Sequence, residues 1–554
     1  MKGTNKLTIK NCSAYLRDKA KGIDWKLLVL LLLFLDVKMV VKVIAIVIVY
    51  ILQPDLSFGF RSKNSRLPLF YPIMIAIGLL NLIISGLFIK LNYELVFITG
   101  VSFWILSILA IHQVKLSVEK NDPATTHRTI LYFFLINSAV SLIMYAAIVW
   151  ETKSLNPFQY QGGFEKYFIS TGDYIKGLTF DTSTTNAVIS LFGVFYFLYR
   201  KNIFCCLLSM VVLLLAGSNI INIIFCLALI YTFIFQSTKD QKSILVICAM
   251  FLVIFMAKVS PQNKNYLSET YHNYFEKNTT IYQAKEPVDS LAQKNKILTQ
   301  DEIKEKIARE YLDSINDLIR KKEKNKIIGN ISPVFVSQIT GKPQIPTPNI
   351  NSPSFQYKQD TTALQVSLLN FIHNNKDELS LSSRDTSLKR PGKIIAIQQT
   401  LNYFKKYPGK VITGAGIGNF SSKLAFRSTA MDLAGGYPKS CAYINKDFEI
   451  NHFDLYLYYF SKTDNIHSLA NTSNSVYDQL LAEYGLLGLL SFFIFYIGFF
   501  TKHRKHLTYG IPLLLILTGV FFIDYWFEQL SVVILFELLL LLNIKETKSS
   551  TAVK

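Results

Sequence analysis

Charged residues and cysteines available for cross-linking are both scarce in this chain. Of its 554 residues, 17% are charged and 51% are hydrophobic, whereas a soluble globular protein has about 25% charged residues. Four of the six cysteines lie inside apolar segments: Cys205, Cys206, Cys226 and Cys248. This distribution excludes a disulfide framework and a four-ligand zinc site. The composition argues against a cytosolic enzyme and indicates a multi-pass membrane protein.

Acidic residues are also few relative to basic ones. The chain has 58 Lys and Arg against 38 Asp and Glu, a formal net charge of +20. In a soluble protein this excess would suggest a nucleic-acid partner. Here the basic residues form short clusters between apolar runs, so we expect no nucleic acid and interpret the clusters as cytoplasmic loops.

Apolar runs that approach the ~20 residues needed to cross a bilayer recur along the chain. They are Leu27–Leu52, Leu67–Ile89, Tyr93–His112, Thr129–Val149, Asn186–Tyr199, Ile203–Ala216, Ile220–Phe235, Ser243–Val259, Gln479–Phe500, Leu507–Ile523 and Trp526–Leu542. No small-residue cleavage site follows the first run, so we expect it to stay in the membrane. Both termini are basic and predicted to be cytoplasmic, which an odd number of spans does not allow. We therefore predict that Leu27–Leu52 is a hairpin broken at Asp36-Val37-Lys38.

The predicted fold is an all-α polytopic membrane protein with about 11–12 transmembrane helices and one large, mostly helical periplasmic loop domain before the last three helices. Its parts are a cytoplasmic N-terminus (1–26), N-terminal transmembrane helices (27–259), the periplasmic loop domain (260–478), C-terminal transmembrane helices (479–543) and a cytoplasmic tail (544–554). Within the loop domain, a capping box predicts the start of an amphipathic helix that covers Gln300–Lys326. Apolar spacing predicts a second helix from about Ile394, ended by Pro408-Gly409.

Four stretches combine residues suited to chemistry. They are the basic run Lys389–Lys393, the glycine run Gly414–Phe420 (GAGIGNF), His467 with Ser473–Gly488, and Gly177–Asn186 with the turn Ala216–Asn219. Taken in this order and topology, they resemble the O-antigen ligase and polymerase superfamily of bacterial surface-glycan enzymes. The resemblance covers most of Gly177–Phe500, although each motif alone is short.

This resemblance implies glycosyl transfer at the periplasmic face of the bacterial inner membrane, with no metal and no cofactor. The implied donor is a glycan on undecaprenyl pyrophosphate, and the acceptor is a glycolipid such as lipid A-core or another lipid-linked glycan. Positive charge would hold the pyrophosphate, with Arg390 as first candidate, then Arg384 and Arg427. Close backbone approach and N–H groups of the glycine run would bind the donor, which makes the following residues candidate binding residues: Gly414, Gly416, Gly418 and Asn419.

The acceptor hydroxyl needs a base or an orienting group. Many members of the superfamily have a His-Asn pair before the re-entrant helix, where this chain has Ser473-Asn474. His467 is our candidate for the histidine, with Glu483 as a second catalytic candidate and Asn474 and Asp478 as binding residues. The middle turn reads Ser218-Asn219 where many relatives have Ser-Arg, and both residues are candidate binding residues.

Each candidate also has a structural interpretation. Arg390 and His467 are typical of solvated charges in loops, and the glycine run is typical of a tight turn near the bilayer surface. A carboxylate such as Glu483 near the start of a helix is stabilised by the helix dipole. Two functional alternatives also remain: a polymerase of the same fold, and a transporter or flippase for lipid-linked sugars. The second expects pseudo-symmetric halves, and no internal repeat is evident.

Overall fold

Helices form all the regular secondary structure in the described part of the chain. The computed structural model describes residues 22–59, 67–159, 175–260, 308, 370–371, 374, 391–429, 435–453, 455, 472–505 and 507–552. Within these ranges, four helical segments are long and apolar enough to cross a membrane: Tyr93–Lys120, Pro123–Thr152, Lys239–Val259 and Val476–Thr501. The chain is therefore a helical membrane protein. Apart from residue 308, the predicted helix Gln300–Lys326 lies outside the described residues, as does most of the predicted loop domain.

The predicted break in the first apolar run is confirmed. Four residues separate helix α2 (Trp25–Phe34) from α3 (Met39–Leu52), and the two helices pack against each other. The buried Lys42 ammonium donates to the carbonyl of Phe34 over 2.8 Å and so satisfies the end of α2. With 10 and 14 residues, each arm is shorter than the ~20 residues of a full crossing. The hairpin is present, but it does not supply two complete passes.

The other N-terminal helices coincide with the predicted runs. They are α4 (Phe70–Ile84), α5 (Tyr93–Lys120), α6 (Pro123–Thr152), α7 (Ser183–Tyr199), α8 (Ile203–Leu215), α9 (Asn219–Phe235) and α10 (Lys239–Ile254), which continues as a π-helix to Val259. Their starts follow capping chemistry. Asp122 caps α6 ahead of Pro123, and Thr238 with Gln241 forms a capping box at α10.

The C-terminal part contains shorter helices and two interrupted ones. They are α14 (Gly392–Lys406), α15 (Lys410–Thr413), α16 (Lys423–Arg427), α17 (Lys446–Phe448), α19 (Val476–Ser491), a π-helix (Phe492–Ile497), α20 (Gly498–Thr501), α21 (Gly510–Val520), α22 (Trp526–Gln529) and α23 (Ser531–Ala552). The predicted stop at Pro408-Gly409 is confirmed, because α14 ends at Lys406. The predicted last span is divided at Leu530, which has a φ of +67°.

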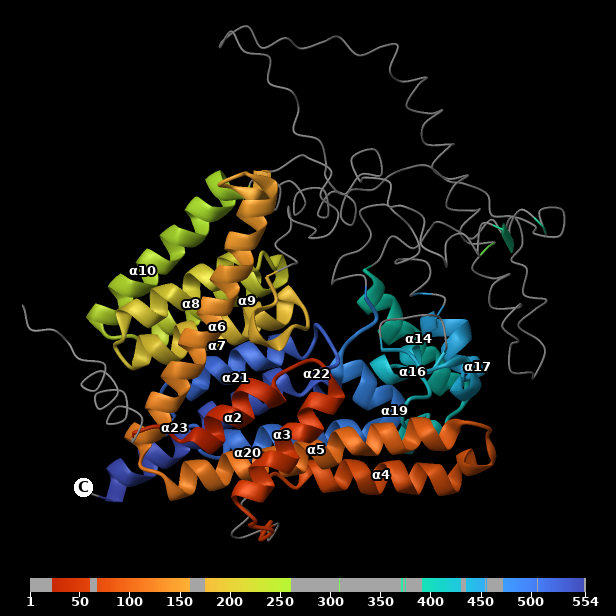
Figure 1. The fold of residues 1–554 in the computed structure, drawn as a ribbon. Coiled ribbons are helices and arrows are strands. Elements are labelled where there is room, and N and C mark those ends of the chain that lie inside the picture. Colours follow the sequence, from red (N-terminus) through yellow and green to blue (C-terminus); the bar gives the residue numbers. More distant parts are fainter. Residues whose placement is uncertain are drawn as a thin grey trace, which may run out of the picture.

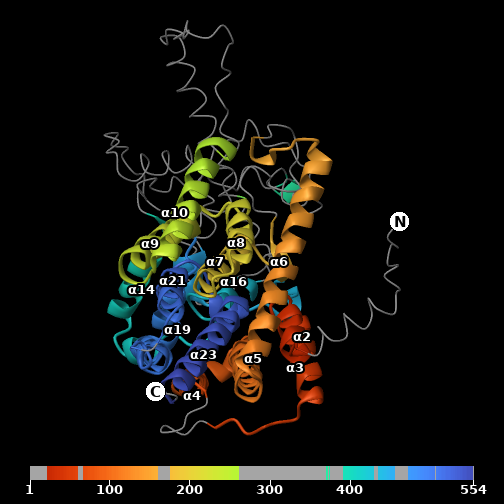
Figure 2. The ribbon, with the colours of Figure 1, turned by 90° about the vertical axis from the view of Figure 1, so that its left-hand side faces the viewer.

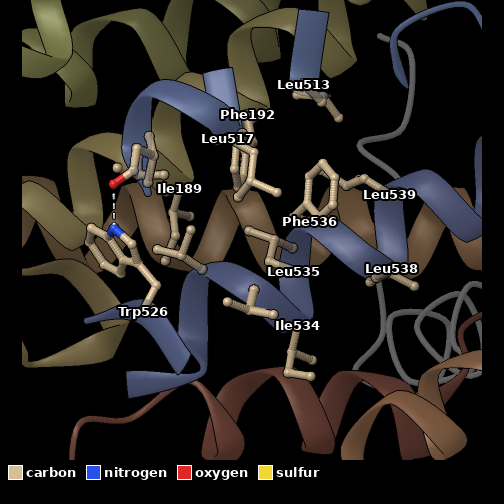
Figure 3. Packing of buried hydrophobic residues seen from close by; sticks show 14 of the residues in the cluster. Ile189, Phe192, Leu513, Leu517, Trp526, Ile534, Leu535, Phe536, Leu538 and Leu539 are labelled. Atoms are coloured by element: carbon tan, nitrogen blue, oxygen red, sulfur yellow. Dashed lines mark hydrogen bonds between the residues drawn. The ribbon is translucent and has the colours of Figure 1, made fainter. Parts of the chain in front are cut away.

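Helix α23 lies at the centre of the apolar core. Its residues from Val532 to Leu542 are buried, which is typical of a helix enclosed by others. Figure 3 shows Phe536 near Phe192 of α7 and Leu517 of α21, with the Trp526 indole donating to the carbonyl of Val520 over 2.6 Å. Helices α4 and α5 lie side by side, and the small helices α14, α16 and α17 gather at one end of α19 (Figure 1; Figure 2 gives the end-on view). That end contains the predicted site.

Candidate functional site

The glycine run forms a buried loop between α15 and α16. Gly414, Gly416 and Gly418 have φ angles of +79°, +99° and +67°, a region in which residues with a side chain are strained. A β-carbon on Gly416 would also lie 2.7 Å from the Leu87 side chain. Glycine is therefore required here by the path of the chain, and the loop as a whole is buried.

Helix α19 is broken where this loop touches it. Gly485 has φ +67° and ψ −166°, which is not helical. Backbone carbonyls next to a break in a helix lose the N–H donors that the next helical turn normally provides. Two N–H groups of the glycine loop donate to such carbonyls. The N–H of Ala415 donates to the carbonyl of Ala482 over 2.8 Å, and the N–H of Gly416 donates to the carbonyl of Glu483 over 2.9 Å. The loop thus pairs with the broken helix through backbone hydrogen bonds.

The Glu483 side chain closes the same loop from inside. One carboxylate oxygen accepts the N–H of Gly418 over 2.7 Å, and the other accepts the N–H of Phe420 over 3.1 Å. The residue is 1% exposed. A carboxylate with both oxygens bound to backbone donors positions a loop, and this geometry favours the structural interpretation of Glu483 over direct contact with a substrate.

This arrangement corrects one expectation about the glycine run. We expected its N–H groups to be available to the donor. The following N–H groups instead already donate to acceptors of the chain itself: those of Gly414, Ala415, Gly416, Gly418 and Phe420. The loop can shape a site, but these groups do not present free donors to a phosphate.

Asn419 anchors the outer side of the loop. Its side-chain oxygen accepts the hydroxyl of Tyr443 and, over 3.1 Å, the amide of Asn445. Burial raises the pKa of Tyr443 to about 12, so its hydroxyl stays protonated and donates. The Asn419 side-chain nitrogen has no hydrogen-bond partner within the part of the chain that the structure describes. Among the described residues, only the oxygen of the Asn419 side-chain amide is therefore hydrogen-bonded.

Asp478 lies in the first turn of α19 and joins three elements. Its two oxygens accept the hydroxyls of Thr400 and Ser421, each over 2.7 Å. The Nε2 atom of His452 lies 4.0 Å from one of these oxygens, and the imidazole packs edge-on against Phe420 with ring centroids 4.4 Å apart. Burial lowers the pKa of His452 to about 3, so the ring is neutral at pH 7. Neither ring nitrogen has a hydrogen-bond partner among the described residues.

Lys393 is a buried cation beside this pair. It is 2% exposed, and its ammonium donates to the Thr472 hydroxyl over 3.1 Å, to the Ile523 carbonyl over 2.8 Å and to the Asn474 carbonyl. Burial lowers its pKa to about 7, against the opposing attraction of Asp524 and Asp478. Lys393 thereby ties α14 to the segment before α19 and to the turn after α21.

A half-buried carboxylate, Glu528, lies on the α16 side. It accepts the N–H of Leu424 over 2.9 Å and the Gln479 side-chain amide over 2.6 Å. Arg427, one of our arginine candidates, lies on α16, is half-buried and interacts electrostatically with Glu528. The half-buried Asn474 donates to Asp524 over 3.3 Å. Arg427 and Asn474 are thus the candidates that lie between the buried side chains of this cluster and the protein surface.

The structure brings most of the described candidates together at the start of α19. The group consists of Gly414, Gly416, Gly418, Asn419, Arg427, Asn474, Asp478 and Glu483. Ser218 and Asn219 lie on the turn between α8 and α9, and none of the hydrogen bonds above involves them. Arg384, Arg390 and His467 lie outside the described residues. Arg390 directly precedes Pro391, the residue that caps α14.

Sequence reasoning assigned no site role to His452, counted Lys393 only as part of the basic run Lys389–Lys393, and interpreted Glu528, four residues after Asp524, as an interfacial charge. A signal existed for Lys393, because Lys393, Ala396 and Thr400 follow each other at helical spacing on the buried face of α14. His452 has no comparable pattern around it. Comparison of the chain with family models, with curated proteins and with solved structures gave no match.

Proposed function

We propose that this chain is a membrane glycosyltransferase of the O-antigen ligase type. It would move a glycan from undecaprenyl pyrophosphate to a glycolipid or glycan acceptor at the periplasmic face of the bacterial inner membrane, without a metal or cofactor. The observation that supports the proposal is the docking of the glycine loop on the break of α19 at Ala482–Gly485. Motifs about 70 residues apart meet there, next to the helix that follows Arg390.

In our proposal, some residues of the cluster bind the leaving diphosphate and others hold those residues in position. In the reaction, the acceptor oxygen bonds to the anomeric carbon as the bond from that carbon to the pyrophosphate oxygen breaks. The leaving diphosphate needs positive charge, for which an Arg fork is suited. Arg390 and Arg427 are our candidates, because Arg390 directly precedes Pro391 and α14 in the sequence and Arg427 is half-buried beside the cluster.

The acceptor hydroxyl also has to lose a proton. His467 is our candidate to accept this proton. The buried imidazole of His452 lies next to Asp478, and because burial lowers its pKa to about 3 it is a weak base at pH 7, so we assign this pair to hydrogen-bonding and orienting the hydroxyl. The pair is buried, so in our proposal it acts on an acceptor that has entered between α14 and α19. Asn474, which is half-buried at the edge of the cluster, would orient that acceptor.

Purified protein and a lipid-linked glycan donor test the reaction. We expect Arg390→Ala to abolish glycan transfer while the protein stays in the membrane, and Arg390→Lys to retain part of it. The matched control is Lys405→Ala, an exposed cation on α14. Wild-type transfer by Arg390→Ala would remove this residue from the mechanism.

The same assay separates a ligase from a polymerase. With lipid A-core present, a ligase caps this acceptor, whereas a polymerase lengthens the lipid-linked chain without it. Absence of both products from the wild-type protein would contradict the proposal. An epitope tag within 330–350 tests its topology, because labelling of that tag from the cytosolic side would rule out a periplasmic reaction.

A further inference from the structure

A basic hollow lies at the end of a membrane-spanning segment, away from the cluster described above. The segment Val476–Thr501 ends at a cavity of about 440 Å³. Its lining consists of Gly498, Thr501, Lys502, Arg504 and Lys505. We call this feature the basic cup.

The backbone holds the basic cup in a tight turn. The N–H of Lys502 donates to the carbonyl of Gly498 over 3.1 Å, and the N–H of Arg504 donates to the carbonyl of Thr501 over 3.0 Å. Glycine at 498 leaves the wall of the hollow without a side chain. The turn therefore places three cations around one space within four residues of sequence.

The cations of the cup differ from two other basic residues, Arg200 and Lys545. Arg200 pairs with Glu546 over 3.2 Å, and the Lys545 ammonium donates to the carbonyls of Val118 and Asn121 over 2.7 and 2.6 Å. Lys502, Arg504 and Lys505 are exposed and form no ion pair within the described ranges. A helix C-terminus carries only about half a negative charge, so three cations exceed what the end of the helix requires.

The same helical segment has an exposed apolar face that leads to the cup. Leu486, Leu490, Phe493 and Ile494 are between 43% and 59% exposed. Their spacing places them along one side, and Gly498 follows Ile494 by four residues. An apolar stripe that ends in a cluster of cations matches an amphiphile with hydrocarbon chains and an anionic head.

We propose that the basic cup binds the phosphodiester of an anionic phospholipid. Its position at the end of a membrane span puts the cations at the depth of the headgroups. Arg504 offers a planar fork to phosphate oxygens, and the two lysines add point charges. The acyl chains of the same lipid lie along the stripe that starts at Leu486. This inference is independent of the proposed glycosyl transfer.

Lipid binding to the detergent-purified protein tests the proposal. Native mass spectrometry with added phosphatidylglycerol, phosphatidylcholine or inorganic phosphate measures which of them stays bound. We expect phosphatidylglycerol to be retained in preference to phosphatidylcholine, and inorganic phosphate not to be retained. The triple variant Lys502→Gln/Arg504→Gln/Lys505→Gln should bind phosphatidylglycerol at least tenfold more weakly, because it removes all three charges that attract the phosphate.

A control variant separates the cup from net charge. Lys90→Gln/Lys405→Gln/Lys439→Gln removes the same charge from exposed positions outside the cup, and it should bind phosphatidylglycerol like the wild type. Gel filtration checks that each variant is folded. Undiminished phosphatidylglycerol binding by the cup variant would overturn the proposal. So would equal loss in the control, equal retention of phosphatidylcholine, or retention of inorganic phosphate, which would indicate an anion site that does not require a lipid.

Discussion

A β-carbon on Gly485 would lie 2.6 Å from the backbone nitrogen of Gly414, and one on Gly414 would lie 2.3 Å from the carbonyl carbon of Glu483. The glycine loop and the broken helix are therefore in direct backbone contact. Both glycines have positive φ angles, so each position is demanding in conformation as well as in space. This contact brings the Glu483 carboxylate beneath the loop and aligns the loop with the first turns of α19.

Gly485→Ala should destabilise the protein strongly. The new methyl group meets the Ile412 carbonyl oxygen at 2.3 Å, and the backbone contact cannot widen without breaking the pairing of Ala415 with Ala482. Overpacking costs about 1–3 kcal/mol and the left-handed conformation about 1–2 kcal/mol more. Thermal unfolding in detergent measures the loss. Gly409→Ala is the control, because nothing lies within 4 Å of that position and its φ is −61°. An unchanged unfolding temperature for Gly485→Ala would contradict the contact.

Glu483→Gln tests whether this residue holds the loop. The amide retains one oxygen for an N–H donor, but it places an NH2 group against the other N–H. A buried donor left unsatisfied costs about 1–3 kcal/mol, so we expect lower stability and reduced glycan transfer. Denaturant unfolding and the transfer assay measure the two effects. Glu94→Gln, at an exposed position, should change neither. Full stability with complete loss of transfer would instead assign Glu483 to the reaction itself.

The fold was largely predictable because a membrane span requires a long apolar run. Boundaries such as the start of α5 at Tyr93 and the end of α9 at Phe235 follow directly from hydropathy and charge. The break between α2 and α3 was also predictable, since Asp36 and Lys38 interrupt an apolar run. The break at Leu530 was not, because its residue type gives no sign of a left-handed conformation.

Some members of the candidate site were predictable from the sequence, but its contacts were not. The resemblance identified the glycine run and the start of α19, and the structure brings them together. The role of Glu483 depends on which N–H groups face it, and this follows from tertiary contact alone. Lys393 belongs to a basic run that is typical of solvated charge, and only the packing of α14 on α19 buries it.

Lys393 should make stability increase with pH above neutrality. Its pKa is about 7 in the folded protein and 10.5 as the ordinary value, so between these limits the unfolded chain binds more protons than the folded one. Stability then rises with pH by at most about 1.4 kcal/mol per pH unit. Denaturant unfolding at pH 7 and pH 9 measures the change. Lys393→Met should lose this increase, whereas Lys405→Met on the exposed side of α14 should keep it. The same slope in Lys393→Met and the wild type would contradict the buried ammonium.

His452 should make the protein sensitive to acid. Its pKa is about 3 in the folded protein and 6.5 as the ordinary value, so between these limits the unfolded chain binds the extra proton. Stability therefore falls as the pH is lowered through this window, by about 2 kcal/mol from pH 6.5 to pH 5.0. The variant His452→Phe keeps an aromatic ring against Phe420 and removes the proton site. Between pH 6.5 and pH 5.0, the free energy of unfolding of this variant should therefore fall by about 2 kcal/mol less than that of the wild type. The half-exposed His503 provides the control His503→Gln, which should follow the wild type. If His452→Phe lost stability as steeply as the wild type, the imidazole would have to be charged or solvated in the fold, and its role beside Asp478 as a neutral hydrogen-bonding group would be wrong.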